Sequence, residues 1–364
     1  MDICNACRFC SGYCAVFQIA ALRRTFSNAD LGYLANLCHS CRNCYYACQY
    51  APPHEFAIDL PTRFAQVRIE TYEEYTWPRP LAAALQRSGV VISATVALCV
   101  TMALILVVGL QGPASRFSPG INSGAFYSVI PWKVMASVAG SALGLSLVAL
   151  GVGVVRFWRD TNGGVPLSIH RHALRRAIVD ILTLRNLGGG GLGCIDQGGS
   201  FSQARRRSHH FMLYGLALCF GSTALATIYD HILGRPAPYP IDSMPVILGT
   251  LGGIGIIIGT GRLTWYKIIC GPSPTMQNLG ADFAPLVLLM LVATSGLLLL
   301  AFRATASMAA LLAIHLGVVL SFFVLFPYTR LTHGAYRAAA LLRAAMERGT
   351  AHGKQFPVAP SRQA

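Results

Sequence analysis

The chain has 364 residues, of which 54% are hydrophobic and only 12% are charged, and its mean hydropathy is +0.51. Soluble domains carry about 25% charged residues, so this composition excludes an ordinary soluble protein and indicates a membrane protein with a smaller soluble part. The formal net charge of +15 would suit nucleic acid or anionic lipid as a partner, and its distribution along the chain decides between them.

Eight of the twelve cysteines lie within the first 48 residues, in two runs of equal spacing: CNACRFCSGYC at 4–14 and CHSCRNCYYAC at 38–48. Both are C-x2-C-x2-C-x3-C, the bacterial ferredoxin run in which three thiolates hold one cluster and the fourth ligates the other. We therefore predict two [4Fe–4S] clusters. One is held by Cys4, Cys7, Cys10 and Cys48, and the other by Cys38, Cys41, Cys44 and Cys14.

Two alternatives use the same cysteines. Four thiolates can hold zinc, but two complete ferredoxin repeats favour clusters. Disulfides are rare in the cytoplasm, where we expect this segment to stay because no signal segment precedes it.

Ferredoxin runs often continue with proline, whereas Ala15 and Gln49 stand at those positions here. The linker between the runs has the apolar spacing of helices, which favours a helical ferredoxin domain over a β-hairpin one.

Six uncharged apolar stretches follow, at about 89–110, 134–155, 211–229, 243–261, 283–302 and 304–329. Each is near the roughly 20 residues that a helix needs to cross a bilayer. The predicted fold is mainly α, with an iron–sulfur domain at 1–80 and a six-helix membrane domain at 81–333. A cytoplasmic tail is predicted at 334–364.

The charges give the orientation. The loop at 156–208 carries nine arginines against three aspartates, whereas the predicted outer loops hold few basic residues. By the positive-inside rule, both termini and this loop face the cytoplasm of a bacterial inner membrane. The net charge therefore reflects topology, and we predict no nucleic-acid partner.

Histidines inside or beside apolar helices are candidate haem ligands, because ionisable residues in membranes are costly and usually functional. His209 and His210 precede the third stretch and His231 follows it, while His315 lies within the sixth stretch and His333 just after it. Paired by depth, His210 with His333 and His231 with His315 predict one or two bis-histidine haem b groups. His209 is the alternative to His210, and His231 beside Asp230 could instead serve protonation at a quinone site.

The combination of these features is similar to a known family. The double cysteine motif, LGGGGLGC, RRRSHHFMLYGLALCF, LGRPAPYP and AIHLGVVLSFFVLFPYTRLTHGAYR together resemble the tricarballylate/citrate-utilisation protein B (TcuB/CitB) family over nearly the whole chain. The membrane half also resembles the di-haem gamma subunits of respiratory nitrate reductase in its arrangement of histidines.

The resemblance implies a membrane iron–sulfur protein that reoxidises the flavin of an FAD-dependent tricarballylate dehydrogenase (TcuA-like) on the cytoplasmic face. The electrons would go to membrane quinone. A related fused flavohaemoprotein acts on precorrin in cobalamin synthesis, so a redox role in corrinoid oxidation is one alternative. No G-x-G-x-x-G follows a strand in this chain, so we expect no FAD or NAD site, and substrate oxidation falls to another chain.

The sequence thus predicts an electron-transfer subunit of an oxidoreductase system rather than a complete enzyme. An iron–sulfur membrane redox sensor is the rival from another class, and it would need no haem. A six-helix transporter would leave the eight cysteines without a role.

Overall fold

The computed structural model describes residues 1–110, 122, 124–162, 170–189, 191, 193–195, 200–269 and 279–353. By its internal contacts the chain forms two compact units. One unit combines residues 1–71, 154–203 and 333–364, and the other combines 72–153 and 204–332. Each unit is described by itself. The described part of the chain is almost entirely helical, and its only sheet pairs two short antiparallel strands.

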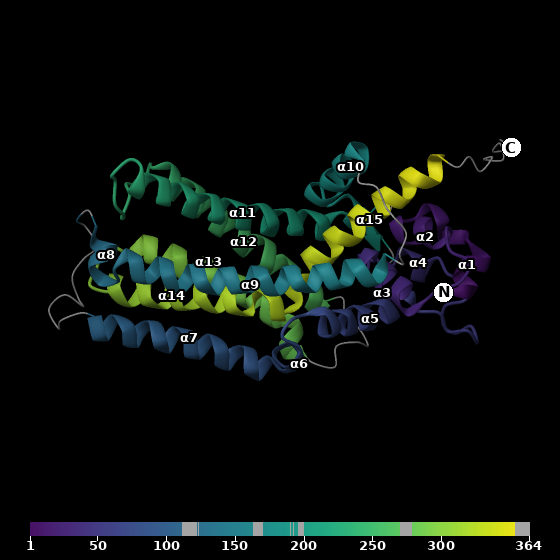
Figure 1. Cartoon of the computed structure of the whole chain (residues 1–364), viewed down its shortest axis with the longest axis horizontal. Coiled ribbons are helices and arrows are strands. Elements are labelled where there is room, and N and C mark those ends of the chain that lie inside the picture. Colours follow the sequence, from purple (N-terminus) through teal and green to yellow (C-terminus); the bar gives the residue numbers. More distant parts are fainter. Residues whose placement is uncertain are drawn as a thin grey trace. The chain divides into compact units, whose positions relative to one another are not determined.

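The cysteine-rich unit is built from short helices that come from three distant parts of the chain (Figure 1). Its elements are α1 Asp2–Cys7, η1 Phe9–Gly12, α2 Ala15–Ala20, α3 Asn28–Leu37, α4 Asn43–Tyr46, the start of α5 Leu60–Tyr75, α10 Arg171–Leu182, η3 Arg185–Gly188, β1 Cys194–Ile195, β2 Phe201–Ser202 and α15 His333–Gly353. The predicted C-terminal tail therefore begins as a long helix. The helical linker predicted between the cysteine runs is present as α2 and α3.

Helix α3 shows why this unit folds locally. Ser27 and Asp30 form a capping box, in which the Ser27 hydroxyl accepts from the Asp30 backbone N–H and the Asp30 carboxylate accepts from the Ser27 N–H. Such a box satisfies two backbone donors that a helix start leaves open. The C-terminal half of α3 is buried, with Tyr33 and Leu34 fully covered. The helix therefore ends in the core, immediately before Cys38.

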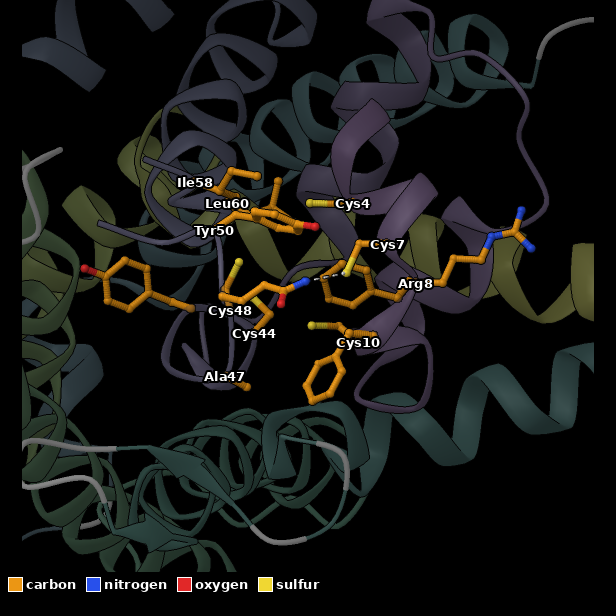
Figure 2. Close-up of a pocket in the computed structure, with 14 residues that line it drawn as sticks. Cys4, Cys7, Arg8, Cys10, Cys44, Ala47, Cys48, Tyr50, Ile58 and Leu60 are labelled. Carbon is orange, nitrogen blue, oxygen red and sulfur yellow. Dashed lines mark hydrogen bonds between the residues drawn. The ribbon is translucent and has the colours of Figure 1, made fainter. Parts of the chain in front are cut away.

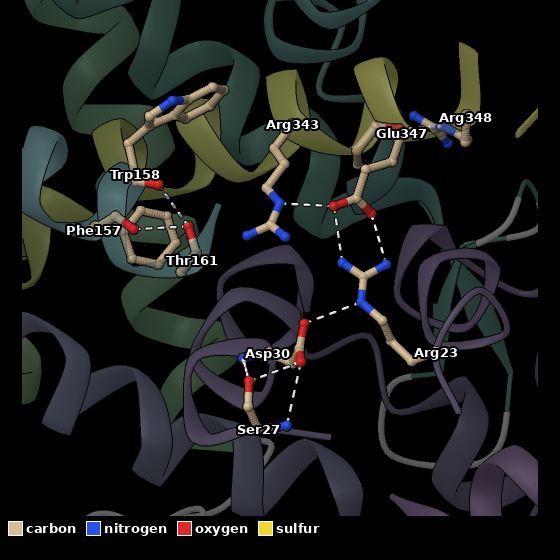
Figure 3. A network of polar contacts seen from close by, with 10 residues as sticks. Arg23, Ser27, Asp30, Phe157, Trp158, Thr161, Arg343, Glu347 and Arg348 are labelled. Atoms are coloured by element: carbon tan, nitrogen blue, oxygen red, sulfur yellow. Dashed lines mark hydrogen bonds and ion pairs between the residues drawn. The ribbon is translucent and has the colours of Figure 1, made fainter. Parts of the chain in front are cut away.

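Helix α15 is held to this core by a charged network (Figure 3). Glu347 accepts two hydrogen bonds from the Arg23 guanidinium, at 2.9 and 2.8 Å, and one from Arg343 Nε at 2.7 Å. Arg23 Nε also donates to Asp30 at 3.0 Å, and the Arg343 guanidinium lies 4.3 Å from the centre of the Tyr33 ring. The side chains of Arg23 and Glu347 are only 16% and 11% exposed. One carboxylate thus neutralises two largely buried cations.

Helix α10 packs on α15 through small side chains. Ala173 and Ala177 are buried against Ala345 and Met346. The larger apolar side chains of α10 lie on the surface of the unit: Leu174, Ile178, Val179 and Leu182.

The other unit contains long apolar helices. Its elements are the end of α5, α6 Arg79–Arg87, α7 Gly89–Leu110, α8 Ala125–Val129, α9 Trp132–Thr161 (whose last turns belong to the first unit), α11 Ala204–His231, α12 Met244–Ile269, α13 Leu279–Phe302, α14 Met308–Leu325, η4 Phe326–Tyr328 and η5 Arg330–Thr332. Six of its helices are long and apolar enough to cross a membrane, and each coincides with a predicted stretch. The prediction of six apolar helices is therefore confirmed.

These helices pack closely. Helices α13 and α14 run side by side (Figure 1), and the buried core joins α7, α12, α13 and α14 around Ile256, Leu289 and Phe322. Helix α12 lies along α11 with Gly252 and Gly259 at the contact, as small residues allow in membrane helices. The Ser146 hydroxyl of α9 donates to the Phe323 carbonyl of α14.

The charged network around Glu347 gives the first prediction. Glu347→Gln should leave the buried Arg343 without its counter-charge and Arg23 with Asp30 alone, which costs about 3 kcal/mol in comparable buried pairs. Opening of α15 should then become roughly a hundredfold more frequent, and trypsin should cut at Arg343 and Arg348 correspondingly faster. The exposed Glu55→Gln is the matched control. Equal cleavage rates in the Glu347 variant and the wild type would show that the network does not hold α15.

Candidate iron–sulfur site

The first cysteine motif is a tight turn between two helices. Cys4 and Cys7 lie on α1, Cys10 lies on η1, and Cys14 is the residue before α2. Arg8, directly after the second cysteine, has a left-handed backbone with φ of 54°. This conformation is uncommon outside glycine, and it reverses the chain between Cys7 and Cys10.

The second motif repeats this geometry. Cys38 ends α3, Cys44 lies on α4, and Arg42, again directly after the second cysteine, has φ of 62°. The two motifs therefore share their spacing and the left-handed residue after the second cysteine, although Cys4 and Cys7 lie in a helix and Cys38 and Cys41 do not. In each, a left-handed residue turns the chain so that successive cysteines lie on one side of the turn.

The thiols fall into two neighbouring groups, and each group draws its fourth member from the other motif. The thiols of Cys4, Cys7, Cys10 and Cys48 surround a cavity of about 330 Å³ (Figure 2). Cys44 and apolar side chains also line this cavity. Burial, followed by the charges of Cys48, Cys4 and Cys7, raises the pKa of Cys10 to about 11. The pKa of Cys4 is also raised, first by burial and then by the charges of Cys48 and Cys7.

The second group shows the same crossing. Burial, followed by the charges of Cys38 and Cys41, raises the pKa of Cys14 to about 12. The pKa of Cys44 is raised by burial and then by Cys38, Cys14 and Cys41. Cys14 thus lies near Cys38 and Cys41 and Cys48 near Cys4 and Cys10, while Cys44 also senses Cys10 and lines the first cavity. The assignment of four ligands to each cluster stays a prediction.

The raised pKa values test whether these residues suit a metal centre. At neutral pH the buried thiols are protonated unless a cation stabilises their thiolates, so ligation must release protons. Neighbouring groups of thiols, the first of them around a cavity lined mainly by apolar side chains, fit polynuclear iron–sulfur centres. Among the described side chains, no three His, Cys, Asp or Glu residues are grouped closely enough to hold a single metal ion, so there is no preformed single-ion zinc site in that part of the chain.

A glycine-rich loop covers the second motif. The Asn43 amide donates to the carbonyls of Gly189 and Gly193 at 2.7 and 2.9 Å, and its oxygen accepts from the Ile195 N–H at 3.1 Å. Gly189 and Gly193 have φ of 54° and 122°, and a Cβ on either would overlap the loop or Ser202. These contacts explain the glycines at 189 and 193, and Cys194 beyond them is buried.

Two arginines meet at Cys38. Arg68 of α5 donates to the Cys38 carbonyl at 2.9 Å and to the Ser40 hydroxyl at 2.8 Å. Arg337 of α15 donates to the same Cys38 carbonyl at 2.9 Å. No local pattern in the sequence predicts these two contacts, because the partners lie 30 and 299 residues apart.

In the apolar unit, His315 of α14 lines a cavity of about 290 Å³ enclosed by α11, α12, α13 and α14, with Phe220 and Phe323 in its wall. His315 Nδ1 lies 2.9 Å from the Ser295 hydroxyl of α13. A Cβ at Gly296 would lie only 2.9 Å from His315 Cε1, so this glycine makes room for the imidazole. The arrangement fixes the ring through Nδ1.

The other predicted histidines lie elsewhere. His231 ends α11, with its ring 4.2 Å from that of Trp132 and its Nδ1 3.6 Å from Asp230, and it does not line the His315 cavity. His209 Nδ1 lies 3.0 Å from the Arg205 carbonyl, whereas the His210 ring stacks on Tyr214. His333 begins α15 in the cysteine-rich unit and His210 belongs to the other unit, so their pairing stays a prediction, as does the pairing of His231 with His315.

Comparison with known proteins agrees with the cysteine site. The profile of the family described as "Citrate utilization protein B Fer4-like domain" matches residues 1–74, and that of "Citrate utilization protein B" matches residues 85–354. The chain belongs to the citrate utilization protein B family. It is 43% identical to citrate utilization protein B of Escherichia coli over 364 residues, which cover 99% of this chain and 93% of that protein. No solved structure matches it. The family resemblance predicted from the motifs is thus confirmed.

The glycine-rich loop gives the second prediction. Asn43→Ala should leave the Gly189 and Gly193 carbonyls without this donor, at a cost of about 2 kcal/mol, while the Ile195 N–H keeps the Cys41 carbonyl as an acceptor. The loop should open more often, and Cys194 should react with a maleimide roughly thirtyfold faster, as measured by peptide mass spectrometry. Asn28→Ala, an exposed residue at the start of α3, should leave the rate unchanged. Unaltered labelling of Cys194 in the Asn43 variant would mean that the amide does not secure the loop.

Proposed function

We propose that this chain is the membrane electron-transfer subunit of an oxidoreductase system. It would take electrons from the reduced flavin of a partner dehydrogenase and deliver them to membrane quinone. The observation that carries the proposal is the crossed convergence of the thiols into two groups of four. The Fer4-like domain and the six apolar helices on the same chain support it.

The proposed ligands follow the two groups of thiols. Cys4, Cys7, Cys10 and Cys48 would hold one [4Fe–4S] cluster, and Cys38, Cys41, Cys44 and Cys14 the other. When bound, such clusters carry single electrons at potentials set by charge, hydrogen bonds to sulfur and solvent exposure. The protein's own contribution is to place the thiolates, exclude water from the second group and fix the surroundings.

The face beside Cys7 is proposed to receive the partner. Cys7 itself is exposed, and Phe9, which lines the same cavity, is 65% exposed. Tyr46 and Phe56, which contact the cavity residues Tyr45 and Tyr50, are 49% and 50% exposed. Exposed apolar patches of this kind mark interaction sites, and aromatic residues are enriched in protein interfaces. A flavoprotein docked there, a tricarballylate dehydrogenase (TcuA-like) in the family resemblance, would have its flavin near the first group of thiols.

The histidines are proposed to hold haem b, one group or two. His315 would suit ligation of haem iron, because Ser295 holds Nδ1 and Nε2 would remain to bind the metal, as is usual for histidines that bind metals. His231 is its proposed partner. His333 with His210, or with His209 in its place, would hold the second group near the cytoplasmic side. The orientation with both termini in the cytoplasm rests on the arginine-rich loop.

Electron transfer from flavin to quinone tests the function directly. Purified wild-type protein in detergent should carry electrons from photoreduced FAD to a short-chain ubiquinone. Cys41→Ser should lose one cluster and block quinone reduction while the haem content stays unchanged, whereas Cys99→Ser in α7 should behave as the wild type. Wild-type protein that binds clusters but never reduces quinone would contradict the proposal and favour a sensor. Loss of haem together with the cluster would show that the two sites depend on each other.

The membrane histidine gives a further prediction. His315→Ala should remove one haem per chain from the pyridine-haemochrome assay. Ser295→Ala should keep the ligand but weaken haem retention about tenfold, because the ring loses its orienting partner. His172→Ala, on the exposed side of α10, is the control. Unchanged haem content in His315→Ala would rule this residue out as a ligand.

A further inference from the structure

Two guanidinium groups converge on the backbone of one cysteine. Arg68 and Arg337 both donate to the Cys38 carbonyl at 2.9 Å, and both contacts are partly buried. Arg68 also donates to the Ala35 carbonyl at 3.0 Å, and Arg337 Nε lies 3.4 Å from the Asn36 carbonyl. At the first group, by contrast, Arg8 is exposed to solvent and donates to the Asn5 carbonyl at 3.0 Å.

These contacts also serve as a cap, because the last carbonyls of α3 need donors. Capping alone, however, does not require a charge. A guanidinium remains charged at every accessible pH, and a charge that is partly shielded from water acts more strongly on its surroundings than an exposed one. The positive charge beside Cys38 therefore has an electrostatic effect beyond the cap.

The position of Arg337 on α15 is informative. It stands four residues after His333, and residues four apart lie on the same face of a helix. The helix therefore presents a proposed haem ligand and, one turn later, the group that binds Cys38. The network of Glu347 with Arg23 and Arg343 fixes this helix against the cysteine-rich core.

We propose that Arg68 and Arg337 raise the reduction potential of the centre held by Cys38, Cys41, Cys44 and Cys14, and that this centre is the one that passes electrons toward the membrane histidines. The inference rests on the proposed iron–sulfur function. In the step concerned, one electron moves from the Cys7-side centre, which is oxidised, to the Cys38-side centre, which is reduced. No covalent bond changes and no proton is needed. The added negative charge is stabilised by the two guanidiniums.

A redox titration followed by electron paramagnetic resonance of the full-length holoprotein tests this. Arg337→Gln and Arg68→Gln should each lower the equilibrium constant for reduction of one centre about tenfold, which is about 59 mV for a single electron. The signal of the other centre should not move. Each single variant keeps the other arginine on Cys38, so the cap persists. Arg337→Lys, which retains the charge, should restore most of the potential.

The matched control is Arg348→Gln. It makes the same charge change on the same helix, eleven residues further on, where Arg348 donates to Gln18 at 3.0 Å. Unchanged potentials in both glutamine variants, or equal shifts in Arg348→Gln, would overturn the inference while leaving the proposed function intact. Loss of the cluster signal in both single variants would make the arginines structural and would also overturn it. A wild type without any cluster signal would instead refute the proposed function.

Discussion

The crossing of the two cysteine motifs is the constraint on which the rest of the cysteine-rich unit depends. Each group of four thiols is complete only when the fourth cysteine of one motif reaches the first three of the other. Neither motif can therefore form its site alone. The linker between them has to return the chain, and it does so as two short helices whose apolar faces make the core, with Ile19, Tyr33 and Leu34 fully buried.

Bringing the thiols together carries an electrostatic cost, which appears as their raised pKa values. Without metal the thiols would remain protonated, so the site gains from a centre that accepts thiolate charge. Arg68 and Arg337 add to this stabilisation of negative charge, because they place positive charge at the Cys38 carbonyl. In the apolar unit, the buried imidazole of His315 likewise has a polar partner in Ser295, and Gly296 leaves space for the ring.

The local pattern of the sequence was enough to predict the Fer4-like domain and the apolar helices. Cluster ligation demands a fixed spacing within about eleven residues, and a membrane helix demands about 20 apolar residues, so both leave signals that can be read locally. The positions of Asn43 and Arg337 could not be predicted this way. Their partners lie 146 and 299 residues away, and no periodicity connects such positions. The run of glycines stands out in the sequence, but its contact with Asn43 could not be predicted from it.

The histidine sites were only partly predictable from the sequence. A lone imidazole in an apolar stretch is conspicuous, and the structure gives His315 a cavity and an orienting hydroxyl. The choice between His209 and His210 depends on helix rotation: one ring lies back on the Arg205 carbonyl and the other stacks on Tyr214. Spacing alone does not distinguish two adjacent residues, whereas these contacts show that their rings have different surroundings.

The central claim is that the eight crossed cysteines hold two [4Fe–4S] clusters on a chain that also binds haem. The most direct measurement is a dithionite-reduced minus oxidised visible spectrum of the purified protein, with iron, acid-labile sulfide and pyridine-haemochrome assays on the same sample. The account predicts about eight non-haem irons and about eight sulfides per chain, together with one or two haem b groups. Zinc in place of iron would contradict the cluster assignment, and iron without haem would contradict the electron path through the histidines.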